Sequence, residues 1–354
     1  MDPATHGLVG AAAALLVAPR RPSVKAPASE DASRLRSFRA LALAGALAAM
    51  SADLDVLLNL PSDPLFQLEF HRQFSHAVLF TPLAALLVSA ALWPLLRSRL
   101  QPSNLGFGCL YATCLLGYAT AGPLDACTSY GTQLLWPFSS ARIAWNLVPV
   151  VDPLLTLGLL MALALALKTG RRLWTVLALV WLGLNLCHGA LQKNRAAQAS
   201  LQRQQQRGHR PQEIVIKPTL GNQMLWRVNY LHDGRVYADA VWTLPGTAPR
   251  LYPGESAPLV VPQRDFPELD TTVSGNDLER FARLSEGYLV RHPGERNAIG
   301  DARYAMLPNS LSPLWAVRFN PAAPDRHVEF RTYRDSSPEV RTALKAMLLG
   351  RPLK

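Results

Sequence analysis

The sequence has few cysteines, and its acidic residues are distributed unevenly. Only four of the 354 residues are cysteine, and residues 192–354 contain none. A disulfide framework or a CxxC metal site is therefore excluded from the C-terminal half. Only nine of the 25 acidic residues precede residue 191, in the part where long apolar runs recur. The sequence thus predicts a membrane environment for the first half and an aqueous one for the second.

The C-terminal half also lacks the common catalytic signatures. It contains no GxSxG, no HExxH and no phosphate-binding loop. Alternating apolar residues over 213–217, 225–231 and 236–242, with a turn at 232–234, predict a small antiparallel sheet. Amphipathic helices are expected over 276–290, with Leu289 among the apolar positions, and near 337–349. We therefore predict a small α+β domain over residues 211–354.

Apolar runs in the first half have the composition of membrane-spanning helices, which need about 20 such residues. We predict an all-α polytopic membrane domain over residues 1–190 with about six spans, joined to the α+β domain by a linker helix over 191–210. The first run is short, so a re-entrant or interfacial helix is the alternative for it. The predicted spans cover residues 7–19, 38–60, 73–96, 105–124, 147–167 and 173–190.

Basic residues are concentrated in alternate loops between these runs. Loops 20–37, 97–104 and 168–172 carry ten of them, whereas loops 61–72 and 125–146 carry only Arg72 and Arg142. The positive-inside rule places the basic loops in the cytoplasm and the C-terminal domain outside it. Clusters of basic residues beside membrane spans usually bind anionic lipid headgroups, so the net charge of +11 is not interpreted as nucleic-acid binding. The ten residues are Arg20, Arg21, Lys25, Arg34, Arg36, Arg97, Arg99, Lys168, Arg171 and Arg172.

Histidines and carboxylates gather at the predicted outer ends of the spans. Ionisable groups at membrane depth are costly and normally face a cavity or one another. Imidazoles and carboxylates are the usual ligands of zinc and related divalent ions, and a catalytic site needs about three of them. A bound divalent ion, with zinc favoured, would activate water for hydrolysis. The candidate metal ligands are His6, Asp53, Asp55, His76 and Asp125.

Arg72 lies between the two histidines of the run His71–His76. A guanidinium beside a metal suits contact with a phosphate or carboxylate on a substrate. Asp55, His71 and Arg72 are the candidate catalytic residues. Simpler structural roles remain open for several polar residues. Asp152 precedes Pro153, so it can either cap a helix or join the site.

Five short segments form a distinctive pattern: Met1–Gly7, Ala52–Asp55, His71–His76, Leu124–Thr132 and Leu135–Phe138. Together they resemble the YdjM-type family of bacterial inner-membrane metal-dependent hydrolases, whose longer members carry an extra C-terminal domain. The resemblance covers residues 1–160 and implies a metal site formed by His6, Asp53, Asp55, His71, His76 and Asp125. One position departs from the family pattern, because Ala121 stands where a histidine usually precedes Asp125 by one helical turn.

The leading hypothesis is a metal-dependent hydrolase at the periplasmic face of a bacterial inner membrane, acting on a lipid or an amphiphilic phosphate or ester. One alternative is a catalytically degenerate scaffold that presents the C-terminal domain, which the alanine at position 121 favours. The other is an ion transporter. It would need polar residues through the membrane thickness, and the inner halves of the spans have almost none. The sequence predicts no oligomeric state.

Overall fold

The computed structural model describes residues 1–18 and 28–353, which form two compact units. The first unit comprises residues 1–58, 70–189 and 220–222. The second comprises residues 59–69, 190–219 and 223 onward, so segment 59–69 groups with the C-terminal part of the chain. Some predicted features lie outside the described residues. They are the basic residues Arg20, Arg21 and Lys25, which were used to predict topology, and the last residue of the first predicted span.

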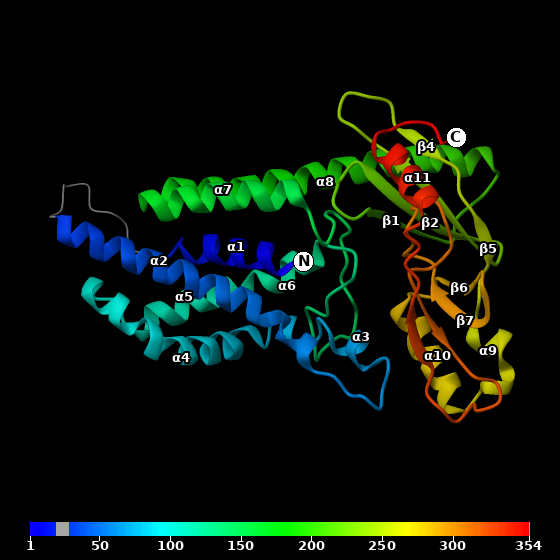
Figure 1. Cartoon of the computed structure of the whole chain (residues 1–354), viewed down its shortest axis with the longest axis horizontal. Helices are drawn as coiled ribbons and strands as arrows, with labels where there is room; N and C mark the ends of the chain where they lie inside the picture. The colour runs from blue at the N-terminus through cyan, green and yellow to red at the C-terminus, as the bar shows by residue number, and fades with distance from the viewer. Residues whose placement is uncertain (19–27, 354) are drawn as a thin grey trace. The chain divides into compact units, whose positions relative to one another are not determined.

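The first unit is helical (Figure 1). Four helical stretches are long and apolar enough to cross a membrane: 30–57, 81–103, 107–126 and 172–206. Helix α7, with 17 residues, rises only about 26 Å, and α1 has 12 residues, so helix length does not establish the predicted count of six. The helices up to residue 206 are α1 (Pro3–Ala14), α2 (Ala28–Ser51), α3 (Phe66–Phe70), α4 (Thr81–Leu100), α5 (Phe107–Ala119), α6 (Ala121–Ala126), α7 (Pro153–Thr169) and α8 (Arg172–Gln206), with 3-10 turns η1 (Ala52–Leu57), η2 (Phe74–His76) and η3 (Gln101–Ser103). Of these, α3 up to residue 69 and α8 from residue 190 belong to the second unit.

Three glycines allow α1, α2 and α5 to approach closely (Figure 1). A Cβ atom at Gly10 would lie 2.6 Å from the carbonyl oxygen of Gly45, and one at Gly117 would lie 2.4 Å from the same oxygen. Small residues permit such backbone contact between membrane helices. A larger side chain at any of these glycines would push apart the helices that bear or precede His6, Asp53 and Asp125.

The second unit contains two antiparallel sheets. One has the order β1-β2-β3-β4, with β5 also paired to β3, and the other has the order β6-β7-β8-β9. The predicted turn at 232–234 joins β2 to β3, and Asp233 and Gly234 both have the positive φ that tight hairpins require. The strands are β1 (Glu213–Pro218), β2 (Leu225–His232), β3 (Arg235–Trp242), β4 (Arg250–Tyr252), β5 (Ser256–Pro258), β6 (Leu289–His292), β7 (Glu295–Asp301), β8 (Trp315–Arg318) and β9 (Glu329–Thr332).

The helices of the second unit are α9 (Pro262–Asp265), η4 (Pro267–Leu269), α10 (Val273–Leu284) and α11 (Pro338–Leu348). Helix α10 differs from the predicted helix over 276–290. It begins earlier, because Thr272 caps it by accepting a hydrogen bond from the Gly275 amide. It ends at Leu284 because Glu286 and Gly287 adopt positive φ, which places Leu289 in strand β6.

Candidate metal centre

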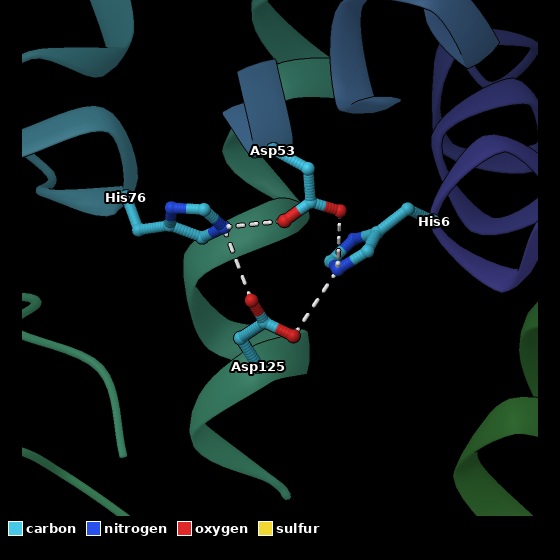
Figure 2. Close-up of side chains that lie close together, drawn as sticks. All are labelled: His6, Asp53, His76 and Asp125. Atoms are coloured by element: carbon cyan, nitrogen blue, oxygen red, sulfur yellow. Dashed lines mark hydrogen bonds and ion pairs between the residues drawn. The ribbon is translucent and has the colours of Figure 1, made fainter. Parts of the chain in front are cut away.

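Two histidines and two aspartates from four elements converge in the first unit. His6 lies on α1, Asp53 on η1, His76 on η2 and Asp125 on α6. Each offers one ligand atom, and these four atoms all lie within 4.8 Å of one another. Figure 2 shows the two carboxyl groups alternating with the two imidazoles around a common centre. His6 and Asp125 are fully buried, whereas the Asp53 side chain keeps 14% of its surface exposed.

The distances within this group are close to those between neighbouring ligands of one small cation, and each carboxylate faces the two imidazoles through different oxygens. Zinc bound tetrahedrally at 2.0–2.1 Å holds neighbouring ligand atoms about 3.3 Å apart. His6 Nε2 lies 3.1 Å from Asp125 Oδ1 and 3.8 Å from Asp53 Oδ2. His76 Nε2 lies 3.0 Å from Asp125 Oδ2 and 3.5 Å from Asp53 Oδ1.

A chain of hydrogen bonds fixes the orientation and tautomer of His76. Ser75 Oγ donates to Asp55 Oδ2 over 2.5 Å and lies 2.9 Å from His76 Nδ1. Because Ser75 donates its only hydroxyl proton to Asp55, its oxygen accepts in the second contact, and we assign the donated proton to His76 Nδ1. The lone pair of His76 Nε2 then points into the group. Outer contacts of this kind are typical of metal-binding histidines.

Three buried side-chain atoms of the four residues have no hydrogen-bond partner: His6 Nδ1, His76 Nε2 and Asp125 Oδ2. The last two face each other 3.0 Å apart. Buried polar atoms normally have a partner, and two facing lone pairs repel each other. A cation held between these atoms removes that repulsion, so the donor set suits a divalent metal ion.

Asp55, predicted both as a ligand and as a catalytic residue, lies outside the four-residue group. Its carboxylate accepts hydrogen bonds from His71 Nδ1 at 2.9 Å and from the Arg72 amide at 2.9 Å, in addition to the Ser75 bond. His71 is likewise outside the group, with 23% of its side chain exposed. In this geometry Asp55 orients His71 and, through Ser75, His76.

Arg72 is buried at the edge of the group. Its Nε lies 2.9 Å from Asp125 Oδ2, and its Nη1 donates to Thr128 Oγ1 over 3.0 Å. Its guanidinium carbon is 5.3 Å from the centre of the Tyr130 ring. The backbone of Arg72 has φ 63°, a strained conformation for a residue other than glycine. The bond from its amide to Asp55 helps to hold that conformation.

Local sequence explains how these side chains are positioned. Asp2 caps α1 by accepting from the Thr5 amide, and Pro3 occupies the first helical turn, so His6 sits in a well-defined first turn. Gly122 allows α6 to contact the segment that bears His76, because a Cβ there would lie 2.5 Å from the His76 carbonyl oxygen. Asp152, for which two roles were open, caps α7 through the amides of Leu154 and Leu155.

Three further groups at the site are not predicted from the sequence. The first is Ser75, which contacts Asp55 and His76 and whose place beside His76 in the chain is a local signal. Arg142 donates to the carbonyl oxygens of His71 and Gly131, and its guanidinium carbon lies 5.6 Å from the centre of the Tyr130 ring. The α-amino group of Met1 contacts Asp125 Oδ1. No sequence pattern predicts the last two contacts, because they join segments that are distant along the chain.

Apolar helices long enough to span a bilayer, together with the buried His/Asp group, define a multi-pass membrane protein with a candidate metal site. The pattern of the family described as YdjM inner membrane protein matches residues 1–196, more than half of the chain. The chain therefore belongs to the YdjM inner membrane protein family, which confirms the resemblance. No curated protein and no solved structure matches it.

Proposed function

We propose that the protein is a membrane-embedded, metal-dependent hydrolase that acts at the periplasmic face of the inner membrane. Its substrate would be a lipid or another amphiphilic phosphate or ester. The main support is the pair of buried atoms, His76 Nε2 and Asp125 Oδ2, which face each other without a hydrogen bond. His6 and Asp53 complete a set of four ligands, with zinc as the favoured ion.

The surrounding residues have the chemistry for hydrolysis. The ion would supply an activated water and polarise the bond to be cleaved. His71, held at Nδ1 by Asp55, keeps its other ring nitrogen available to accept and return a proton. Arg72 places a guanidinium beside Asp125, where it can neutralise a phosphate or carboxylate oxygen of the substrate. The partly exposed Asp53 marks the side from which a substrate can approach.

A second candidate is the catalytically degenerate scaffold. One observation favours it: Asp125 already contacts two cationic groups, Arg72 and the Met1 amine, in addition to the two histidines. These groups compete with a metal ion for the same carboxylate oxygens. In that case the first unit would anchor the C-terminal domain without reacting.

Metal analysis of the protein purified in detergent separates the two candidates. The wild-type chain should retain about one zinc ion, and Asp53→Ala should lose it. Release of phosphate from vesicles that contain phosphatidic acid should be lost in Asp53→Ala and in His71→Ala, whereas His71→Ala should retain the metal. Equal and negligible metal content in wild type and Asp53→Ala would favour the scaffold.

Orientation is tested separately by reporter fusions. The distribution of basic residues predicts cytoplasmic reporters after residues 100 and 170, and periplasmic reporters after residues 65, 135 and 354. A cytoplasmic reporter at the last position would overturn the proposed sidedness and would leave the metal site itself unaffected.

A further inference from the structure

Arg72 is a buried cation that uses few of its donors. Its side chain is only 4% exposed, and a guanidinium has five N–H groups. Among the described residues, the hydrogen bonds of this guanidinium go only to Thr128 Oγ1. Its Nε lies 2.9 Å from Asp125 Oδ2 as an ion-pair partner but is buried without a hydrogen bond. Because a buried charge is costly unless it is hydrogen-bonded, this guanidinium has the capacity to bind a further acceptor.

A second arginine of the same unit lies close to Arg72. Arg142 is partly exposed, and its Nη1 donates to the carbonyl oxygen of His71 over 3.3 Å, one residue before Arg72 in the chain. The guanidinium carbons of Arg72 and Arg142 lie 5.3 Å and 5.6 Å from the centre of the same Tyr130 ring. Two like charges gathered at one ring repel each other. An anion bound by both guanidinium groups would remove that repulsion.

The candidate metal group does not need these two positive charges. The carboxylates of Asp53 and Asp125 carry two negative charges, which balance one divalent ion. The neighbouring Asp55 carboxylate accepts hydrogen bonds from the His71 ring and the Arg72 amide. The two guanidinium groups thus add positive charge beside the metal group beyond what a bound ion requires.

A phosphate monoester matches the number of positive groups at the site. It has three terminal oxygens and carries up to two negative charges. The ion, Arg72 and Arg142 could therefore each receive one oxygen, and guanidinium groups suit phosphate oxygens in both shape and charge. A phosphate diester or a carboxylate has only two such oxygens and one negative charge. The donor set thus favours a monoester over both.

Exposed apolar side chains adjoin the site residues in the chain. One follows Asp53 directly, and two others follow His76 within three residues. The Val78 amide donates to the carbonyl oxygen of Leu134 over 3.0 Å, which joins the stretch after His76 to the stretch after Tyr130. Exposed apolar surface beside a polar site suits the hydrocarbon chain of an amphiphile. The side chains, each more than half exposed, are Leu54, Val78, Leu79, Leu135 and Phe138.

We propose that Arg72, Arg142 and Tyr130 form a subsite for the phosphate group of an amphiphilic phosphate monoester. This assignment rests on the proposed function and narrows its substrate from any amphiphilic phosphate or ester to a monoester. Arg142 is the specificity-determining residue of the subsite. It gives a cleaner test than Arg72, which also contacts the candidate ligand Asp125.

Non-hydrolysable probes test the subsite on the zinc-loaded full-length chain in phosphatidylcholine nanodiscs, with empty nanodiscs as the blank for partitioning. Octylphosphonate has three terminal oxygens, whereas its monomethyl ester and nonanoate have two, and methylphosphonate lacks the chain. In titration calorimetry, octylphosphonate should bind at least about tenfold more tightly than either two-oxygen probe, the value of one charged hydrogen bond. Methylphosphonate should bind more weakly than octylphosphonate. Equal affinity for octylphosphonate and its ester would overturn the monoester assignment. Equal affinity for the two phosphonates would indicate a soluble phosphate and overturn the amphiphile.

Variants of Arg142 test the residue itself. Arg142→Gln should weaken octylphosphonate binding roughly tenfold and remove most of its advantage over the ester. Arg142→Lys keeps the charge but not the planar fork, so it should be intermediate. Arg39→Gln is the matched control and should bind as wild type. Arg39 also donates to a backbone carbonyl, that of Leu167 at 3.0 Å, but lies about 18 Å before the end of α2.

The subsite and the hydrolase can fail independently. An unchanged preference in Arg142→Gln would exclude Arg142 from the subsite, and Arg142→Lys decides the same point if Arg142→Gln does not fold. A chain that releases phosphate from phosphatidic acid but binds the phosphonate and its ester equally would retain the hydrolase and lose the subsite. A chain that hydrolyses nothing, yet prefers octylphosphonate through Arg142, would retain the subsite and lose the hydrolase. If the wild-type chain binds no zinc, the same titrations without metal decide the subsite.

Discussion

Two His/carboxylate groups of similar composition occur among the described residues, one in each unit, and they differ in how their polar atoms are paired. In the second unit, Asp63, Asp277 and His327 surround Arg280, and His327 Nδ1 lies 2.8 Å from Asp277 Oδ2. In the first unit, His76 Nε2 and Asp125 Oδ2 lack a hydrogen bond, although Arg72 Nε lies 2.9 Å from the same Asp125 oxygen as an ion-pair partner. Proximity of ligand types is common to both, but buried atoms without hydrogen-bond partners occur only in the first of these groups.

The comparison shows why spacing alone is weak evidence for a metal ion. In the Arg280 group, the guanidinium donates hydrogen bonds to both Asp63 and Asp277, and no side-chain atom of the three ligand-type residues is left buried without a partner. Burial alone would raise the pKa of Asp63, but hydrogen bonds from Arg280 outweigh it and the pKa lies below its ordinary value. Hydrogen bonds from Glu69 and Asp63 raise the pKa of Arg280. We therefore interpret this second group as a structural ion-pair network.

The largest expected effect is a contrast between two aspartate variants, one from each group: one should lose zinc affinity and the other should lose stability. Asp125→Ala should lower zinc affinity by at least about 100-fold, because this carboxylate faces both histidines. Asp277→Ala should leave zinc affinity nearly unchanged. It should instead destabilise the second unit by roughly 2–3 kcal/mol, the cost of removing buried charged hydrogen bonds. Metal titration and chemical denaturation measure the two effects. Zinc loss in both variants would erase the distinction between the groups.

The next effect concerns the apolar core of the second unit that contains Leu65. Leu65→Ala should destabilise the second unit by about 2–5 kcal/mol, because the side chain is fully buried. Leu60→Ala is the matched control in the same segment. Leu60 is 45% exposed, so its replacement should change stability by no more than about 0.5 kcal/mol. Equal losses in a denaturation experiment would show that Leu65 does not contribute to the core as its burial indicates.

Local patterns predicted the parts of the fold that local rules govern. The hairpin β2–β3 follows from alternation and from Asp233-Gly234, and a helical first half follows from the apolar runs. The patterns did not predict that the run 105–124 breaks into α5 and α6 near Thr120. They also did not place segment 59–69 in the second unit, because burial of Leu65 depends on core residues that begin only at Val260.

The candidate site was likewise predicted only in part, because local patterns do not determine which neighbouring residues face each other. Residue type and depth were enough to single out His6, Asp53, His76 and Asp125, which the structure brings together. They could not separate Asp53 from Asp55, which are two residues apart. That distinction arises in the 3-10 turn η1, where Asp53 faces His6 and His76 while Asp55 faces His71 and Ser75.

A smaller effect should appear with pH. Because the pKa of Asp63 is lowered in the folded protein, its contribution to stability is fully present above the ordinary value of 3.8 and is lost as pH falls through the lowered value. Protection of residues 59–69, corrected for intrinsic exchange rates, should therefore be constant from about pH 8 to 5 and decline below about pH 4. Asp63→Asn should remove most of this decline. A wild-type decline already complete near pH 6 would contradict the assignment to Asp63.

The smallest expected effect comes from restoring the histidine of the family pattern. Ala121 and Asp125 lie one turn apart on α6, so Ala121→His would offer a further nitrogen beside the candidate ligands. Pro123 lies in the first turn of α6, where its missing N–H costs no helical hydrogen bond, so it need not be replaced. Ala121 is fully buried, and accommodating an imidazole should cost about 1–3 kcal/mol of stability.

We therefore expect Ala121→His to raise zinc affinity by no more than roughly tenfold, about the effect of one improved contact, and to lower stability. Ala126→His is the matched control, because Ala126 is equally buried on α6 but follows Asp125 directly and points elsewhere on the helix. It should lose stability without gaining affinity. His188 on α8 is not among the four converging residues, so His188→Ala should leave zinc affinity unchanged. A gain at position 126 equal to that at 121 would mean that added histidines bind zinc nonspecifically. No gain at 121, with a fold that tolerates the change, would mean that α6 does not face the metal and would favour the scaffold.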